Sequence, residues 1–299
     1  MYDYILDPSA RNTLSVHQIN DPFLPYQKGK EAFPEEAYSK FKYGCAIQAR
    51  RFGRELADEF VKTRYYIDWK PDGNDIAITA SPYKYIAPAA SSIKRYFTDR
   101  LNEYLIRDGR TTANMLKMSR SVLFEGDYGK LTEEGRTSLL KKDKLTIDRD
   151  FVEGKLLLVI DDIKITGAHE EKVARMLVEN EVAFKEVVFL YYAELTNPEV
   201  VGASYEDRLN HAHVKSLNEL FNIIKNGNFI LNARVCKYLL SHPDSSEVQR
   251  FMDYIGDDFK YDLIAAIHGD GYHTMPTYEK NYRVITKQAA PIKLVTSKV

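Results

Sequence analysis

The stretch LLLVIDDIKITGAHE, residues 156–170, decides the fold. The apolar residues that fill Lys155–Ile160 are typical of a parallel strand covered on both faces. Two acids, Asp161 and Asp162, follow this predicted strand, and a polar loop from Lys164 to His169 leads into a helix predicted from about Glu170 to Asn180. A second apolar strand is predicted over Glu186–Tyr192. Strand, loop, helix and strand in this order predict a βαβ unit and an α/β fold.

The loop after this strand carries the chemistry that the sequence predicts. Open α/β sheets bind ligands at the carboxyl ends of their strands, which is where Asp161 and Asp162 lie. Two adjacent carboxylates are electrostatically costly there unless they meet a cation or hydroxyl donors. Gly167 lets the backbone approach a ligand closely, and the start of the next helix favours a phosphate. We therefore expect a ligand with both hydroxyl groups and phosphate, such as a sugar phosphate.

The same residues resemble the ribose-phosphate signature of type I phosphoribosyltransferases. That signature has four apolar residues, two acids, an apolar residue, any residue, Thr-Thr-Gly, any residue and Thr. Residues 157–169 follow it, except that Ile165 and His169 stand where the signature has threonines. The resemblance implies a parallel sheet flanked by helices and phosphoribosyl pyrophosphate (PRPP) as the ligand. It also implies that Asp161 and Asp162 contact the ribose hydroxyls and that the 5′-phosphate is bound by Lys164, Ile165, Thr166, Gly167, Ala168 and His169.

The resemblance extends upstream to two further segments. The family has a pyrophosphate-binding loop after an earlier strand, which here is predicted over Asp75–Ala80, and Ser81 and Lys84 would hold the pyrophosphate. The family also has a basic segment before the signature strand, which would close over the phosphates with Lys117, Arg120, Arg136, Lys141, Lys142 and Lys144. The cofactor implied is Mg²⁺, which Asp161 and Asp162 would hold directly or through the ligand.

These features predict an enzyme that uses PRPP and Mg²⁺ to ribosylate a nitrogen base or a related acceptor. Asp161 and Asp162 would position the ribose and oppose the positive charge that develops on it. A second hypothesis is a regulatory protein of the same fold that binds PRPP or a nucleotide without catalysis, which Ile165 and His169 favour. A hydrolase or lyase that acts on a nucleotide-like substrate is a third. The sequence shows no motif for the acceptor base and no general base.

The rest of the chain divides into three parts. Residues 1–70 are predicted to form an irregular arm up to residue 35 and then one long amphipathic helix over Glu36–Lys62. Residues 71–200 form the phosphoribosyltransferase-like core, with a helix over Ala89–Ile106 and a strand over Met115–Phe124. Residues 201–299 form a mostly helical addition, with helices predicted over Ser216–Lys225, Ile230–Ser241, Val248–Ile255 and Tyr261–Ile267, turn-rich residues 268–282 and a loosely ordered tail from about Lys287.

The composition of the 299 residues narrows the class of protein. Its 42 Lys and Arg balance 43 Asp and Glu, so a nucleic-acid partner is not expected. Cys45 and Cys236 are too few for a disulfide framework or a thiolate zinc site. The chain has no apolar run of about 18 residues and no signal-peptide pattern at its start. We expect a cytoplasmic protein without a membrane partner, and a homodimer stays open.

Other patterns are weaker. Three other protein classes have acids after an apolar strand, but the sequence speaks against each of them. A receiver domain has its acids after the first strand, whereas here earlier strands are predicted. A P-loop hydrolase needs Gly-x4-Gly-Lys-Ser/Thr, which is absent from the sequence, and an Asp-x-Asp phosphatase needs an acid where Ile163 stands. No third metal ligand accompanies His211 and His213 in the sequence. The polar loop over His268–His273 is a candidate lining for a substrate site. Four tyrosines are candidates for a base pocket: Tyr83, Tyr85, Tyr272 and Tyr278.

Overall fold

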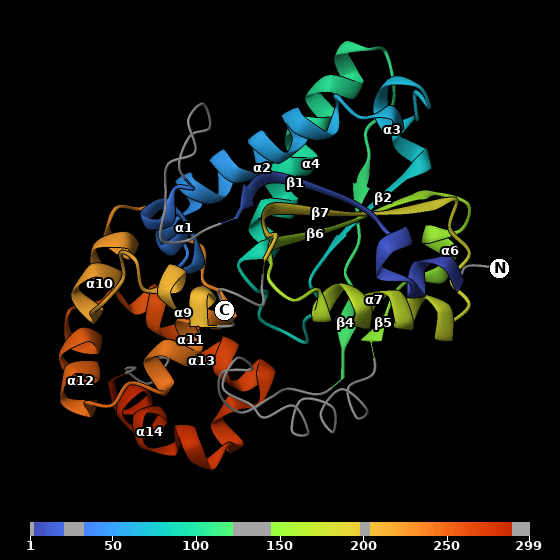
Figure 1. Ribbon diagram of the computed structural model, residues 1–299. Coiled ribbons are helices and arrows are strands. Elements are labelled where there is room, and N and C mark those ends of the chain that lie inside the picture. The colour runs from blue at the N-terminus through green and yellow to red at the C-terminus, as the bar shows by residue number, and fades with distance from the viewer. Residues whose placement is uncertain (1–2, 21–32, 122–144, 198–203, 289–299) are drawn as a thin grey trace, which may run out of the picture.

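A parallel β-sheet forms the centre of the computed structural model, which describes residues 3–20, 33–121, 145–197 and 204–288 (Figure 1). Its five strands lie in the order β1-β7-β6-β2-β3, and every neighbouring pair is parallel. The strands are Asn12–Ile19 (β1), Ile76–Ala80 (β2), Asn114–Met115 (β3), Leu156–Lys164 (β6) and Glu186–Leu195 (β7). The predicted α/β fold with a parallel sheet flanked by helices is confirmed.

The predicted strand before the two acids lies in the middle of the sheet. Leu158 of β6 pairs with Ile78 of β2 on one side and with Val188 of β7 on the other. Residues 156–160 are all buried, as their continuous apolar sequence requires. The predicted end of the strand at Ile160 is too early, because β6 stays paired with β7 through Lys164. Asp161 and Asp162 are therefore strand residues.

Helices cover both faces of the sheet (Figure 1). α2 (Ala46–Phe60) and α4 (Ala90–Arg107) pack on the face that carries Leu158, and α4 matches the helix predicted over Ala89–Ile106. α6 (Arg149–Val152) and α7 (Ala168–Glu179) pack on the face that carries Leu157. This division follows from the alternation of side chains along a strand. The sheet thus has two hydrophobic layers, one on each side.

The long helix predicted over Glu36–Lys62 is wrong, because two helices occupy this segment. They are α1 (Glu35–Lys42) and α2, and a short α3 (Arg64–Ile67) and the 3₁₀ turn η3 (Gly73–Asp75) lead on to β2. The break lies at Gly44, whose φ is +91°. A Cβ there would lie 2.5 Å from the carbonyl oxygen of Ile230. The approach of this distant segment separates the two helices, and the apolar stripe gives no sign of it.

The prediction of an irregular arm is wrong for residues 12–19, which form β1. This strand is the edge of the sheet and pairs with β7 from Asn12 opposite Val188 to Ile19 opposite Leu195. Most of its residues are only partly buried, so the strand needs few apolar side chains and lacks the apolar run of a central strand. Two 3₁₀ turns precede it, η1 (Asp3–Leu6) and η2 (Pro8–Ala10).

The single strand predicted over Met115–Phe124 is also wrong. Its described residues form the end of β3 and a separate strand, β4 (Ser119–Arg120), which pairs antiparallel with β5 (Leu145–Thr146). After Met115 the chain leaves the sheet to follow the loop after β2, where the Tyr83 N–H donates to the Met118 carbonyl at 3.2 Å. The predicted phosphate-binding residues Arg136, Lys141, Lys142 and Lys144 lie outside the described residues.

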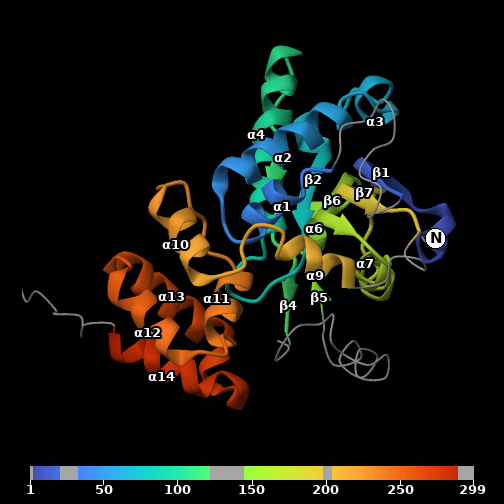
Figure 2. The ribbon, with the colours of Figure 1, turned by 60° about the vertical axis from the view of Figure 1, so that its left-hand side comes forward.

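Helices make up most of residues 204–288, as predicted for the C-terminal addition. They are α9 (Ser204–Asn210), α10 (Leu217–Lys225), α11 (Ala233–Leu240), α12 (Ser245–Tyr254), α13 (Asp257–Asp270) and α14 (Glu279–Gln288). They enclose a third hydrophobic cluster and lie to one side of the sheet, beside α1 (Figure 2). We call α9–α14 and the turns between them the C-terminal helices.

Several of these helices differ from the prediction, and α13 begins at Asp257 instead of Tyr261. α9 was not predicted, and α14 begins inside the segment predicted as turns and crosses the predicted start of a loose tail at Lys287. The other turn-rich residues hold the end of α13 and two 3₁₀ turns, η5 (Tyr272–Thr274) and η6 (Pro276–Tyr278). Within the described ranges, the helices are too short or too polar to cross a membrane.

Candidate functional site

The sheet brings Ser81 and Asp161 together at its carboxyl edge. Ala80, at the end of β2, pairs with Ile160 of β6, so the next residue of each strand lies beside the other. The Ser81 hydroxyl donates to Oδ1 of Asp161 at 2.8 Å. Two residues from separate sequence segments that were predicted to share a site are thus in direct contact.

Asp161 also contacts the start of α7. The imidazole Nδ1 of His169 lies 2.6 Å from Oδ2 of Asp161, and the Asp162 N–H donates to Oδ1 at 2.9 Å. Burial works to raise the pKa of Asp161, but the His169 charge, together with the hydrogen bonds from His169, Asp162 and Ser81, holds that pKa well below its usual value. Asp161 is therefore a carboxylate that stays ionised.

Asp162 faces the other side of the sheet. Because adjacent strand residues point to opposite faces, its side chain meets α1 instead of α7. The Tyr38 hydroxyl donates to Oδ2 of Asp162 at 2.7 Å, and the Lys42 ammonium forms an ion pair with the same oxygen. Burial opposes the charge on Lys42, but Asp162 and Glu206 outweigh it and raise the pKa of the ammonium. The two acids of the signature therefore have separate environments.

The loop between β6 and α7 is shorter than predicted. α7 begins at Ala168, so His169 lies in its first turn, and Lys164 belongs to β6. Gly167 precedes the helix with a φ of +73°, a conformation that glycine adopts without strain. Thr166 is the polar residue that remains in the loop, and its hydroxyl oxygen accepts a long hydrogen bond of 3.5 Å from the Ala168 N–H. Ile165 packs against the hydrophobic cluster of the α2 and α4 face.

Lys164 takes part in a buried charge cluster below the loop. Its ammonium lies 3.0 Å from Oε2 of Glu170 and 3.4 Å from a carboxylate oxygen of Glu194. Arg11 also pairs with Glu170, at 3.1 Å, and the Tyr191 hydroxyl donates to it at 2.8 Å. These contacts fix the first turn of α7 to β6 and β7.

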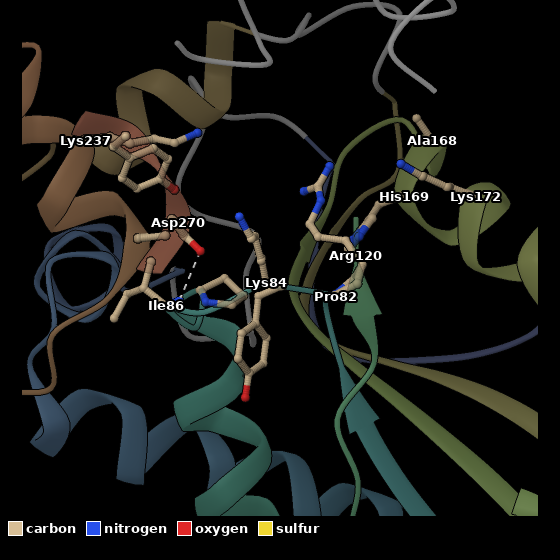
Figure 3. A pocket seen from close by; sticks show the side chains of 13 residues that line it. Pro82, Lys84, Ile86, Arg120, Ala168, His169, Lys172, Lys237 and Asp270 are labelled. Atoms are coloured by element: carbon tan, nitrogen blue, oxygen red, sulfur yellow. Dashed lines mark hydrogen bonds between the residues drawn. The ribbon is translucent and has the colours of Figure 1, made fainter. Parts of the chain in front are cut away.

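A pocket of about 300 Å³ lies between α7, the loop after β2 and the C-terminal helices. Figure 3 shows Arg120, His169 and Lys172 on one side and Lys237 and Asp270 on the other, with Lys84 between them. Among the described residues, four Lys and Arg side chains and one Asp line the pocket, so this lining carries more positive than negative charge. The lining residues are Pro82, Tyr83, Lys84, Ile86, Pro88, Arg120, Ala168, His169, Lys172, Ala233, Lys237, Asp270 and Tyr272.

Part of the predicted site lines this pocket directly. Lys84, Arg120, Ala168 and His169 do so, whereas Ser81, Asp161, Asp162 and residues 164–167 do not. Lys117 lies next to the pocket, where its ammonium donates to the Lys84 carbonyl and lies 4.4 Å from the centre of the Tyr83 ring.

Two of the four tyrosines that were candidates for a base pocket line the pocket, and two do not. Tyr83 and Tyr272 line the pocket, Tyr278 is buried in the cluster of the C-terminal helices, and Tyr85 packs on Gly269.

Sequence reasoning missed two charged lining residues, Lys172 and Lys237, whereas Asp270 lies in a polar segment that was predicted as a candidate lining. Lys172 follows His169 by three residues, so its place on the same helix face was a usable signal. Asp270 belongs to the polar segment His268–His273, of which it and Tyr272 reach the pocket. Nothing in the pattern of α11 distinguishes Lys237 from any other charge on a helix surface. No cluster of three or more metal-ligating His, Cys, Asp or Glu side chains occurs in the described part of the chain.

The chain is similar to a known protein family. Residues 10–285 match the model of a family described as PRTase ComF-like, where PRTase stands for phosphoribosyltransferase. No curated protein matches the chain. The matched range begins before β1 and ends within α14, so it includes the sheet, both helical layers and the C-terminal helices. The resemblance to type I phosphoribosyltransferases is confirmed, and the chain belongs to the PRTase ComF-like family.

Proposed function

We propose that this protein binds PRPP, or another ligand that contains ribose 5-phosphate, in the pocket and transfers its phosphoribosyl group to a nitrogen acceptor. The observation that carries this proposal is the charge around the pocket. Lys84, Arg120 and Lys172 provide positive charge on the side of α7 and the loop after β2, whereas Asp270, the one carboxylate among the described lining residues, lies on the opposite wall. A ligand with several phosphate groups needs such surroundings.

We assign the 5′-phosphate to the start of α7. The N–H groups of a first helical turn have no partner within the helix and favour an anion. Ala168 and His169 of this turn line the pocket, and Lys172 lies on the same face of the helix. A phosphate at this position would meet backbone N–H groups, the positive end of the helix dipole and the Lys172 ammonium.

We assign the ribose to Asp161, because its partner His169 lines the pocket while Asp162 faces α1. Asp161 already accepts hydrogen bonds from Ser81, His169 and the Asp162 N–H. A carboxylate accepts about four hydrogen bonds, so incoming ribose hydroxyls would replace His169 as donors. The imidazole would then turn to the phosphate.

The proposed transfer exchanges one bond at C1 of the ribose for another. The lone pair of the acceptor nitrogen forms a bond to C1, and the bond from C1 to the pyrophosphate oxygen breaks with its electron pair on that oxygen. An acceptor nitrogen that carries a proton loses it to water, whereas a pyridine-type nitrogen has none to lose and keeps the positive charge. Positive charge develops on the ribose ring, and the ionised Asp161 would stabilise it. Lys84 and Arg120 would stabilise the departing pyrophosphate.

The side chains fit a magnesium ion that arrives with its ligand. In such sites Mg²⁺ keeps several waters and takes one or two protein carboxylates together with phosphate oxygens. Asp161 offers one carboxylate beside the pocket, whereas Asp162 is paired with Lys42. When bound, the ion would neutralise charge on the pyrophosphate.

A second candidate function is binding of PRPP or a nucleotide without transfer. The observation that favours it is that protein groups occupy both acids of the signature. Lys42 and Tyr38 hold Asp162, and His169 and Ser81 hold Asp161. A sensor needs the charge of the pocket but has no need of an acid pair directed at one ribose.

Two measurements on the same protein separate these functions. Calorimetric titration with PRPP and Mg²⁺ measures binding, and pyrophosphate release with a panel of nitrogen heterocycles measures transfer. Transfer predicts binding together with release that falls about 10-fold or more in Asp161→Asn, since one lost charge contact in a transition state costs at least that factor. The matched control is Asp262→Asn, an exposed carboxylate on α13.

The outcomes of these measurements are distinct. Binding by the wild type without release of pyrophosphate supports the second function. Release that is equal in Asp161→Asn and Asp262→Asn contradicts the role of Asp161. A wild-type protein that binds no PRPP contradicts both functions.

A further inference from the structure

The C-terminal helices form one wall of the pocket. Ala233 and Lys237 of α11, Asp270 of α13 and Tyr272 of η5 line it, opposite the first turn of α7 (Figure 3). A ligand whose phosphate lies at α7 would extend toward this wall. The chemistry of the wall therefore bears on the part of the reactants that is farthest from the phosphate.

Close contacts fix this wall to the loop after β2. The carboxylate of Asp270, which is only 2% exposed, accepts hydrogen bonds from the N–H groups of Tyr85 at 2.8 Å and Ile86 at 3.4 Å. A Cβ on Gly269 would lie 2.2 Å from the Tyr85 ring, so this ring lies directly on the backbone of α13. The Ala233 N–H donates to the Ala87 carbonyl at 3.1 Å. The wall is thus held in place without a ligand, and little ordering is needed when one binds.

The lining on this side combines apolar and aromatic surface with one cation. Ile86, Pro88 and Ala233 are apolar, and Tyr272 contributes a ring. The carboxylate of Asp270 accepts hydrogen bonds from the backbone N–H groups of the loop. Lys237 is the cation of this wall, and its ammonium lies 5.8 Å from the centre of the Tyr272 ring. This arrangement suits a flat ring that carries a negative group.

We infer that the C-terminal wall binds the acceptor and that Lys237 selects an acceptor that is a planar heterocycle with a carboxylate. The inference rests on the proposed function, because it takes the phosphate end of the ligand to lie at α7. The apolar residues and Tyr272 would cover the ring, and the Lys237 ammonium would donate charge-assisted hydrogen bonds to the carboxylate. A neutral ring of the same shape gains the first contact but not the second.

The test compares heterocycles that differ by a carboxylate. The pairs are uracil with its 6-carboxylate, and pyridine-3-carboxamide with pyridine-3-carboxylate. Pyrophosphate release is measured with the full-length protein, saturating PRPP and Mg²⁺. We expect release with the carboxylated member of at least one pair and a preference of about 10-fold or more over its partner, which is the usual effect of a hydrogen bond to a charged group.

Variants then assign that preference to Lys237. Lys237→Met should raise the KM for the carboxylated acceptor about 10-fold or more and leave the Kd for PRPP unchanged. Lys237→Arg should restore most of the loss, because it keeps the charge. Lys225→Met, which removes an exposed ammonium on α10, should behave as the wild type.

Several results would overturn the inference. Equal rates of pyrophosphate release within both pairs would do so, as would no release with any of the four rings. A Lys237→Met variant that loses affinity for PRPP but not for the acceptor would also do so, because it would place Lys237 at the pyrophosphate. A wild type with no preference within either pair overturns the inference even if a variant does not fold. A wild type that binds no PRPP overturns the proposed function and the inference together, whereas PRPP binding without a preference overturns the inference alone.

Discussion

At the scale of single residues, the ion pair between Lys42 and Asp162 is the least expected feature. The two side chains are 10% and 9% exposed, and Tyr38 donates a further hydrogen bond to the carboxylate. The sequence resemblance assigns Asp162 to the ribose, whereas this geometry gives it a partner within the protein. A charge so deeply buried is costly once its partner is removed.

Lys42→Met should therefore destabilise the protein by about 3–5 kcal/mol, because it leaves the Asp162 carboxylate buried without a counter-charge. The double variant Lys42→Met/Asp162→Leu should recover most of that loss, since no unpaired charge remains. Unfolding in guanidinium chloride measures both free energies, with Lys40→Met on the same helix as the control. A double variant as unstable as Lys42→Met would show that the ion pair is not the cause.

Asp161 makes stability depend on acid pH. Its pKa in the folded protein lies below its value of about 3.9 in an unfolded chain. The stability it contributes is present above pH 4 or so and is lost as the pH falls through the folded pKa. Asp161→Asn should flatten the fall in the free energy of unfolding below pH 4, and Asp262→Asn should not. An equally steep fall in both variants would contradict the low pKa.

At the scale of elements, the sequence predicts what is local. β6, β7 and α7 follow from apolar runs and helical spacing, and β2 and α4 were placed within two residues. β1 was not predicted because an edge strand has no long apolar run. The break at Gly44 was not predicted because the residue that packs against it, Ile230, is distant in sequence. The end of β6 depends on the length of β7 rather than on its own residues.

The turn before α7 gives a test of this local geometry. Gly167 and Gly109 both have a φ of +73°, and neither would bring a Cβ closer than 3.6 Å to a neighbour. Alanine at either position should cost about 1–2 kcal/mol of stability, because both would hold it in the left-handed region. Only Gly167→Ala should also weaken the binding of PRPP, since Gly167 leads into the first turn of α7, where Ala168 and His169 line the pocket. Calorimetry on both variants decides, and equal affinities would separate the loop from the site.

At the scale of the whole molecule, the described pocket lies where α7 and the loop after β2 meet the C-terminal helices. The acids, the loop and His169 were accessible from sequence because they form one contiguous motif. Lys237 was not, because nothing in the pattern of α11 distinguishes it. Asp270 was included in a candidate polar segment, but its contact with Tyr85 joins positions 185 residues apart and leaves no periodic trace. All four candidate tyrosines were chosen by residue type alone. The structure places Tyr83 and Tyr272 in the pocket lining, whereas Tyr85 and Tyr278 do not line it.

The contact of Gly269 with Tyr85 tests this dependence. Gly269→Ala places a methyl group against the Tyr85 ring and should cost about 1–3 kcal/mol of stability by overpacking. It should also weaken PRPP binding about 10-fold, because it displaces the loop that carries Tyr83 and Lys84. Gly256→Ala, where a Cβ meets open space, is the control. Unchanged PRPP affinity in Gly269→Ala would mean that the C-terminal helices do not set the position of the loop.

The assignment of the pocket to a phosphoribosyl ligand is tested most directly by calorimetric titration with PRPP and Mg²⁺. The variant Lys84→Met/Lys172→Met should bind about 10-fold or more weakly than the wild type, and its affinity should fall less steeply with salt, because two phosphate contacts are lost. Lys40→Met/Lys225→Met removes the same charge outside the pocket and should bind as the wild type does. Equal affinity of the two double variants, or a wild type that binds no PRPP, would contradict the assignment.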